Sequence, residues 1–196
     1  MGKPPIGLNV FLANMWNLPE DLLGELRKVS LTPSLNIIVN EKYGSHAADF
    51  RQNLTNDIPK DFEYSISHTQ GLGGFAILHP ARKIGFDLEP MNRVTAKVAT
   101  RIAFAPDEAS QAPSPGHLWV AKEAAFKALR GPKQPQVLSA LKVSGWQRPS
   151  KNSKSTFETF HLETPNISPD NDSIGVTFVW KGFIFGLFMV STKFHP

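Results

Sequence analysis

Lys83-Ile-Gly-Phe-Asp-Leu-Glu-Pro90 alternates apolar residues with small or charged ones, and this period predicts a half-buried β-strand over residues 83–89. Ile84, Phe86 and Leu88 fall on one face of that strand. Asp87 and Glu89 fall on the other face, ~6.5–7 Å apart at the backbone. Neighbouring carboxylates repel each other unless a positive charge lies between them. The pair therefore indicates a site for a hard cation such as Mg²⁺, and the alternative interpretation is a solvent-facing strand edge.

The segments on either side of this strand predict a mixture of helices and strands. A proline followed by an apolar stripe predicts a helix over residues 20–29. Period-2 alternation predicts a strand at 62–68, which a glycine-rich turn at 71–74 joins to a strand at 75–78. Segment 35–40 is left open between helix and strand. Towards the C-terminus we expect a helix from Val94 that stops before Pro106, a helix at 115–130 capped by Ser114, and strands at 141–147, 156–163, 174–180 and 183–190.

The composition excludes several classes of protein. The chain has 196 residues and a net charge of +4, and its lack of cysteine excludes disulfides, thiol nucleophiles and cysteine-ligated metals. Its basic residues form no long run, which argues against a nucleic-acid-binding surface. The longest apolar run, 182–190, is about half the length of a membrane-spanning helix, and the first residues lack the apolar segment of a signal peptide. We therefore expect a soluble, cytoplasmic protein without nucleic acid or membrane as a partner.

A second group of polar residues lies on the predicted helix 115–130. Glu123 and Lys127 are one helical turn apart and face the same way, which is the usual arrangement of a surface ion pair. If another element approaches this helix closely, Glu123 could reach the carboxylate pair of strand 83–89. The residues around it are small enough for such an approach: Ala121, Ala124, Ala125 and Ala128.

A third group, Ser65-Ile-Ser-His68, ends the predicted strand 62–68 just before the glycine-rich turn. Hydroxyls and free backbone N–H groups at such a turn are typical of a phosphate-binding site. A nucleophilic Ser67 activated by His68 is disfavoured, because adjacent residues of a strand point to opposite faces. A histidine with a structural role is the alternative interpretation.

In chain order, these groups resemble the motifs of the 4'-phosphopantetheinyl transferase superfamily. By its length and its N-terminal half, the chain is similar to the larger, monomeric, two-lobed members. The resemblance implies an α+β fold of two similar lobes, residues 1–82 and 83–196, packed as one unit with the active site between them. A weak internal duplication agrees with this, starting at Gly7-Leu-Asn-Val10 and at Gly85-Phe-Asp-Leu88. The matching segments cover about residues 62–130 and are Ser65-Ile-Ser-His68, Gly85-Phe-Asp-Leu-Glu89, Arg101-Ile-Ala-Phe104 with Glu108, and Trp119-Val-Ala-Lys-Glu-Ala-Ala-Phe-Lys127.

The resemblance implies an enzyme that moves 4'-phosphopantetheine from coenzyme A to a serine of an apo acyl or peptidyl carrier protein and releases 3',5'-ADP. Asp87, Glu89 and Glu123 would bind Mg²⁺, or Mn²⁺ in its place. Glu123 would also be the catalytic base for the serine proton, and Lys127 would place a positive charge at the pyrophosphate. The alternative function is a catalytically weakened relative that binds coenzyme A or a carrier without turnover. The carrier's pathway, whether fatty acid, polyketide or nonribosomal peptide synthesis, is left open.

The resemblance also implies residues for the two substrates. Ser67, His68, Lys122 and Lys127 would contact the phosphates of coenzyme A. The larger members hold the adenosine 3'-phosphate with basic residues that have no clear counterpart here, and Lys42, Arg51 and Lys60 are the candidates.

A basic stripe on the helix expected from Val94 is the candidate docking surface for a carrier protein. Its residues are four apart along the chain, and carriers of this kind are usually acidic, so the stripe would steer the carrier during association. The alternative interpretation is a solvated helix face. The stripe consists of Arg93, Lys97 and Arg101.

Overall fold

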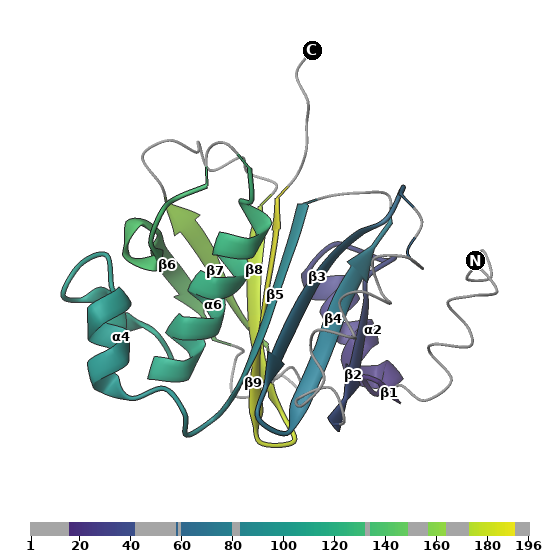
Figure 1. Cartoon of the computed structure of the whole chain (residues 1–196), viewed down its shortest axis with the longest axis horizontal. Helices are drawn as coiled ribbons and strands as arrows, with labels where there is room; N and C mark the ends of the chain where they lie inside the picture. The colour runs from purple at the N-terminus through teal and green to yellow at the C-terminus, as the bar shows by residue number, and fades with distance from the viewer. Residues whose placement is uncertain are drawn as a thin grey trace, which may run out of the picture.

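The structure is a computed structural model, and it describes residues 16–41, 58, 60–79, 83–131, 134–148, 157–163 and 173–190. In these ranges the chain is an α+β fold with two antiparallel sheets, which confirms the predicted class at that level (Figure 1). The first sheet has the order β1-β2-β4-β3 and contains β1 (Trp16–Asn17), β2 (Asn36–Asn40), β3 (Glu63–Thr69) and β4 (Leu72–Leu78). The second has the order β5-β9-β8-β7-β6 and contains β5 (Lys83–Pro90), β6 (Lys142–Gln147), β7 (Glu158–Glu163), β8 (Ile174–Trp180) and β9 (Phe183–Val190).

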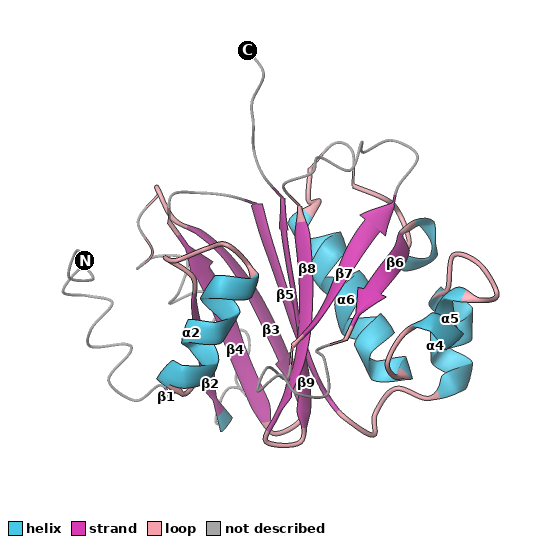
Figure 2. Cartoon of the chain, turned by 180° about the vertical axis from the view of Figure 1, so that it is seen from behind, coloured by secondary structure: helices cyan, strands magenta, loops and turns pink. Residues whose placement is uncertain are grey.

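Helices lie on opposite faces of the sheets. Figure 2 shows α2 (Glu20–Val29) across one face, and Figure 1 shows α6 (Pro115–Ala128) on the opposite face of the second sheet. The hydrophobic core on the α2 side is shared by both sheets, because Leu23 and Leu26 of α2 belong to the same buried cluster as Phe86 and Phe185. The remaining helical segments among the described residues are α4 (Ala96–Ile102), α5 (Glu108–Gln111) and the short 3-10 helix η2 (Leu138–Ala140).

Helix α6 lies unusually close to the second sheet because both surfaces are built from small residues. A Cβ atom on Gly85 of β5 would overlap with the carbonyl oxygen of Ala124, and one on Gly186 of β9 would lie 2.5 Å from the carbonyl oxygen of Val120. The alanines of α6 are fully buried in the same contact. The close approach expected from the sequence is therefore present, and it places Glu123 and Lys127 above β5.

The helix start and the strand pattern follow local sequence signals. Ser114 caps α6, since its hydroxyl accepts a hydrogen bond from the His117 N–H at 3.4 Å. The expected boundaries at 20–29, 174–180 and 183–190 agree with α2, β8 and β9. Segment 35–40, left open before, is strand β2, which pairs antiparallel with β4.

Several expected boundaries differ from the observed ones, and two of the differences move residues into another element. The helix expected from Val94 begins at Ala96, because the Thr95 hydroxyl caps it by accepting from the Val98 N–H at 3.4 Å. Arg93 therefore lies in the turn before α4 and not on the helix. Gly73 and Gly74, expected in a turn, lie within β4 and pair with β2.

The change from one sheet to the other falls near the expected lobe boundary. The strands of the first sheet end at Leu78, and those of the second begin at Lys83. Residues 7–10, where the N-terminal start of the weak duplication was expected, lie outside the described ranges. Within those ranges, no helix combines the length and the apolar character needed to cross a membrane.

Candidate functional site

The edges of the two sheets meet along β3 and β5, and side-chain hydroxyls of β3 bridge them. Ser65 accepts a hydrogen bond from the backbone N–H of Phe86 at 2.9 Å. Ser67 donates to Asp87 Oδ1 at 2.6 Å, and Thr69 donates to Glu89 Oε2 at 3.1 Å. These three residues alternate along β3 and so share one face. We call Ser65, Ser67 and Thr69 the hydroxyl row; it fixes two carboxylates of β5 from the neighbouring sheet.

Asp87 lies at the centre of the site and is buried. Its Oδ1 accepts from Ser67 and from Lys127 Nζ, the latter at 2.7 Å. Lys127 also donates to the carbonyl oxygen of Phe86 at 3.0 Å, so it is attached to β5 at two points. Asp87 Oδ2 is buried and has no hydrogen-bond partner among the described residues. One oxygen of this carboxylate is therefore paired, and the other is buried without a partner in that part of the chain.

Glu89 is also buried, and its partners are a hydroxyl and a guanidinium. Arg93 Nη1 lies 2.6 Å from Glu89 Oε2 and donates to Thr69 Oγ1 at 2.9 Å. Burial, and then the nearby Asp87 carboxylate, raise the pKa of Glu89 above its usual value, while Arg93 and Thr69 act in the opposite direction. The interpretation of the pair as a solvent-facing strand edge is wrong, because both carboxylates are buried.

Glu123 faces the same two carboxylates from α6. Its side chain is half-buried, and its pKa is raised first by burial and then by the charge of Asp87, with a smaller contribution from Glu89. Lys127 lowers the pKa of Glu123 but is bonded to Asp87. The three acids thus form a carboxylate cluster, Asp87, Glu89 and Glu123, whose members interact across α6 and β5.

The donor set of this carboxylate cluster fits a hard divalent cation. It offers carboxylate oxygens, the ligands that Mg²⁺ and Mn²⁺ prefer. Asp87 Oδ2 is a buried acceptor, unpaired among the described residues, and it needs a positive partner. In the described part of the chain, no three acidic or histidine side chains are already arranged around a common metal position. Lys127 and Arg93 instead neutralise Asp87 and Glu89.

Lys122 lies in a different place from the other expected phosphate contacts. It is fully buried and pairs with Glu108 of α5 at 2.8 Å, and its Nζ also donates to the carbonyl oxygen of Leu141. Glu108 accepts in addition from the backbone N–H groups of Val143 and Phe104. Lys122 has no surface free for a ligand in this arrangement, and it joins α6 to α5 and β6.

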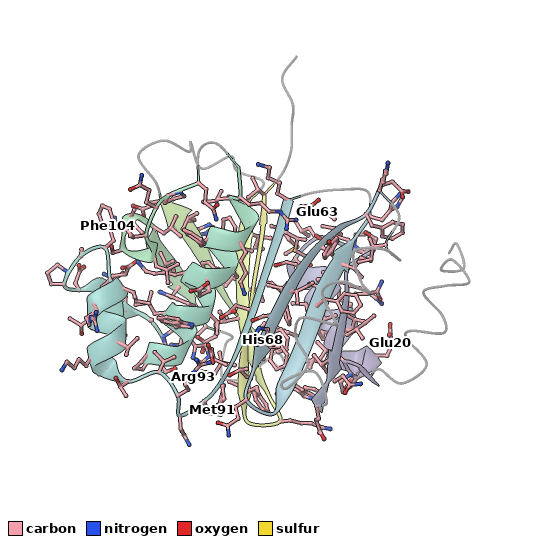
Figure 3. All side chains as sticks on the ribbon, viewed as in Figure 1. Glu20, Glu63, His68, Met91, Arg93 and Phe104 are labelled. Atoms are coloured by element: carbon pink, nitrogen blue, oxygen red, sulfur yellow. The ribbon has the colours of Figure 1, made fainter. Side chains whose placement is uncertain are left out.

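Ser67 and His68 point away from each other, as expected for adjacent residues of a strand. Ser67 is buried in the hydroxyl row, whereas His68 is exposed. Figure 3 shows His68 and Arg93 towards the same end of the sheet edges, with Glu63 at the opposite end of β3. Arg130 ties α6 to that opposite end by its contacts with Glu63 and with the carbonyl oxygen of Tyr64.

The expected basic stripe is divided between two settings. Arg93 pairs with Glu89, while Lys97 and Arg101 are exposed on α4. Arg101 and Glu123 line the same groove, of about 410 Å³, with Phe126 among its apolar walls. The groove therefore joins Arg101 of α4 to Glu123, while Asp87 and Glu89 are not among the residues that line it.

Of the three candidates for the adenosine end of the site, Lys60 alone lies in the described part of the chain. Lys42 and Arg51 lie outside the described residues, and Lys60 is exposed in the turn before β3.

No protein-family model matches the chain, and a search of curated proteins finds no significant match.

We expect Glu123→Gln to raise the melting temperature at neutral pH by about 2–4 °C. The folded state raises the pKa of Glu123, so ionisation of this group costs stability as the pH rises above 4.5, its ordinary value. The gain from glutamine should therefore disappear below that pH, where the acid is neutral in both states. Thermal unfolding across this pH range measures the difference.

Glu163→Gln is the matched control. Lys142 lowers the pKa of Glu163 by a hydrogen bond at the surface, so losing its charge should not stabilise the protein at neutral pH. A Glu123→Gln variant no more stable than wild type at neutral pH would show that burial of this charge and repulsion within the carboxylate cluster do not destabilise the folded state.

Proposed function

We propose that the chain is a 4'-phosphopantetheinyl transferase, which modifies a serine of an acyl or peptidyl carrier protein. The observation that supports this most is the carboxylate cluster beside Lys127 at the junction of the two sheets, one member of which, Glu123, lines a groove shared with α4. The proposal includes the two-lobed architecture, with lobes 1–82 and 83–196 acting as one monomer in the cytoplasm.

In the reaction, the carrier serine oxygen forms a bond to the β-phosphorus of coenzyme A. The bond between the β-phosphorus and the oxygen that bridges it to the α-phosphate breaks, and 3',5'-ADP leaves. A Mg²⁺ or Mn²⁺ ion held by Asp87, Glu89 and Glu123 would supply positive charge at the pyrophosphate. Lys127 adds a second positive charge there, and its bond to the carbonyl oxygen of Phe86 holds its ammonium in place.

Glu123 is the proposed acceptor of the serine proton. A carboxylate whose pKa is raised by burial and by two neighbouring acids takes up a proton more readily near neutral pH than an ordinary surface glutamate does. It also lines the groove, so a serine that enters from the side of Arg101 and α4 would meet it first. Exposed His68 is the proposed contact for a phosphate of coenzyme A. Ser67 has a different role, since it orients Asp87.

The test is incubation of the full chain with coenzyme A, Mg²⁺ and a panel of apo-carriers, read by intact mass. At least one carrier should gain the mass of a phosphopantetheine group, and its Ser→Ala form should gain none. Asp87→Asn should slow the transfer about 100-fold, because the centre of the cation site is lost. The matched control is Asp107→Asn, an exposed acid bonded to Gln111, which should react at the wild-type rate. Absence of a mass gain on every carrier would overturn the proposal.

A further inference from the structure

The two carboxylates of β5 are each neutralised by a basic side chain, but the two basic side chains differ in their freedom. Lys127 is 28% exposed and has two bonds to β5, one to Asp87 and one to the Phe86 carbonyl oxygen. The Arg93 side chain is 57% exposed, and its guanidinium contacts Glu89 and Thr69 with the same nitrogen. Arg93 can therefore turn into solvent and be hydrated there at little cost, whereas Lys127 would leave a backbone acceptor unpaired.

We propose that Arg93 is a built-in counter-ion of Glu89, and that a divalent cation reaches Glu89 Oε2 only by displacing the Arg93 guanidinium. The inference rests on the proposed function in one respect: it takes the carboxylate cluster as the cation site. It assigns Arg93 a charge-balancing role at Glu89, separate from steering a carrier.

Three features support this role. The buried Oδ2 of Asp87, unpaired within the described ranges, marks the place where an additional positive charge is needed. Thr69 holds Glu89 in position from the first sheet, so the carboxylate stays in place when Arg93 leaves. The backbone of Arg93 is fixed in the turn by its N–H bond to the Pro90 carbonyl oxygen at 3.1 Å, so only the side chain has to move.

This arrangement makes the bare site self-neutralising. Without a cation, two basic side chains balance Asp87 and Glu89 and limit the repulsion within the carboxylate cluster. The same balance lowers the affinity for a cation, because the cation must compete with a guanidinium at 2.6 Å. Removing the charge of Arg93 should thus strengthen cation binding, the opposite of what loss of a merely structural contact would do.

The test is direct titration of the full chain with Mn²⁺ in the absence of coenzyme A, following free Mn²⁺ by its paramagnetic resonance signal. Arg93→Gln should bind Mn²⁺ about fivefold more tightly than wild type, or ~1 kcal/mol. Arg93→Lys keeps the competing charge and should stay within about twofold of wild type. The matched control is Lys97→Gln, which loses the same charge from exposed α4 and should also change the affinity by less than about twofold, since solvent and salt screen it.

The outcomes separate this inference from the proposed function. If Arg93→Gln binds Mn²⁺ no more tightly than Lys97→Gln while carriers still gain mass, the inference fails and the transferase proposal stands. If Asp87→Asn binds Mn²⁺ as well as wild type does, the cation is not at the carboxylate cluster, and both the inference and the proposed cation site fail. Tighter binding by Arg93→Gln alone, lost again on adding Asp87→Asn, is the result expected.

Discussion

Lys122→Met should lower the free energy of unfolding by about 3–5 kcal/mol, measured by urea denaturation. The substitution removes one partner of a fully buried ion pair and leaves the charge of Glu108 without compensation. Glu108 would keep its bonds to the backbone N–H groups of Val143 and Phe104, so it could not turn outward without breaking both.

A Lys–Glu pair at the surface provides the control. Lys142 and Glu163 lie 2.6 Å apart, but Lys142 is 40% exposed and water can solvate both charges when the pair is broken. Lys142→Met should therefore cost far less stability than Lys122→Met does. The double variant Lys122→Met with Glu108→Gln should recover part of the loss, since no buried charge remains. Equal losses from Lys122→Met and Lys142→Met would show that burial does not decide the value of these pairs.

Gly85→Ala should destabilise the protein by about 3 kcal/mol, at the upper end of the usual cost of overpacking. The new methyl group would overlap with the backbone of α6 at Ala124, and a backbone carbonyl cannot turn aside as a flexible side chain can. Helix α6 would have to move away from β5. The contact between Lys127 and Asp87 would lengthen with that movement, so the proposed transfer reaction should slow as the stability falls.

Gly24→Ala is the control for this substitution. Gly24 lies on α2, and a Cβ there would meet no atom within 4 Å. Alanine has the higher helix propensity, so this variant should gain about 0.5–1 kcal/mol. A Gly85→Ala variant as stable as wild type would mean that α6 does not need glycine beneath it.

The sequence predicted the elements whose pattern is local. Period-2 alternation located β3 and β5, and the Ser114–Pro115 pair located the start of α6, because these signals depend only on neighbouring residues. A short apolar run fits a buried strand and a buried helix equally well, so β2 could not be assigned until its pairing with β4 was known.

The sequence predicted the acidic residues of the candidate site but not the residues with which they form ion pairs. Asp87, Glu89 and Glu123 could be identified from spacing, but Lys127 pairs with Asp87 across two elements and not with Glu123 on its own helix. The burial of Lys122 had a signal that was not used: Leu118, Ala125 and Leu129 lie on the same helical face and are all buried. Its partner Glu108 lies in another element, and spacing within α6 carries no information about it.

The hydroxyl row has a consequence for solubility as well as for the site. β3 and β5 are edge strands of their sheets, and an exposed edge strand is a template to which a strand of a second chain can pair. Here the two edge strands face each other inside the molecule and are joined by hydrogen bonds of Ser65, Ser67 and Thr69. The residues that orient the carboxylates thus also protect the chain against aggregation through these two strands. Substitutions in the hydroxyl row would therefore change both the orientation of the carboxylates and the resistance to aggregation.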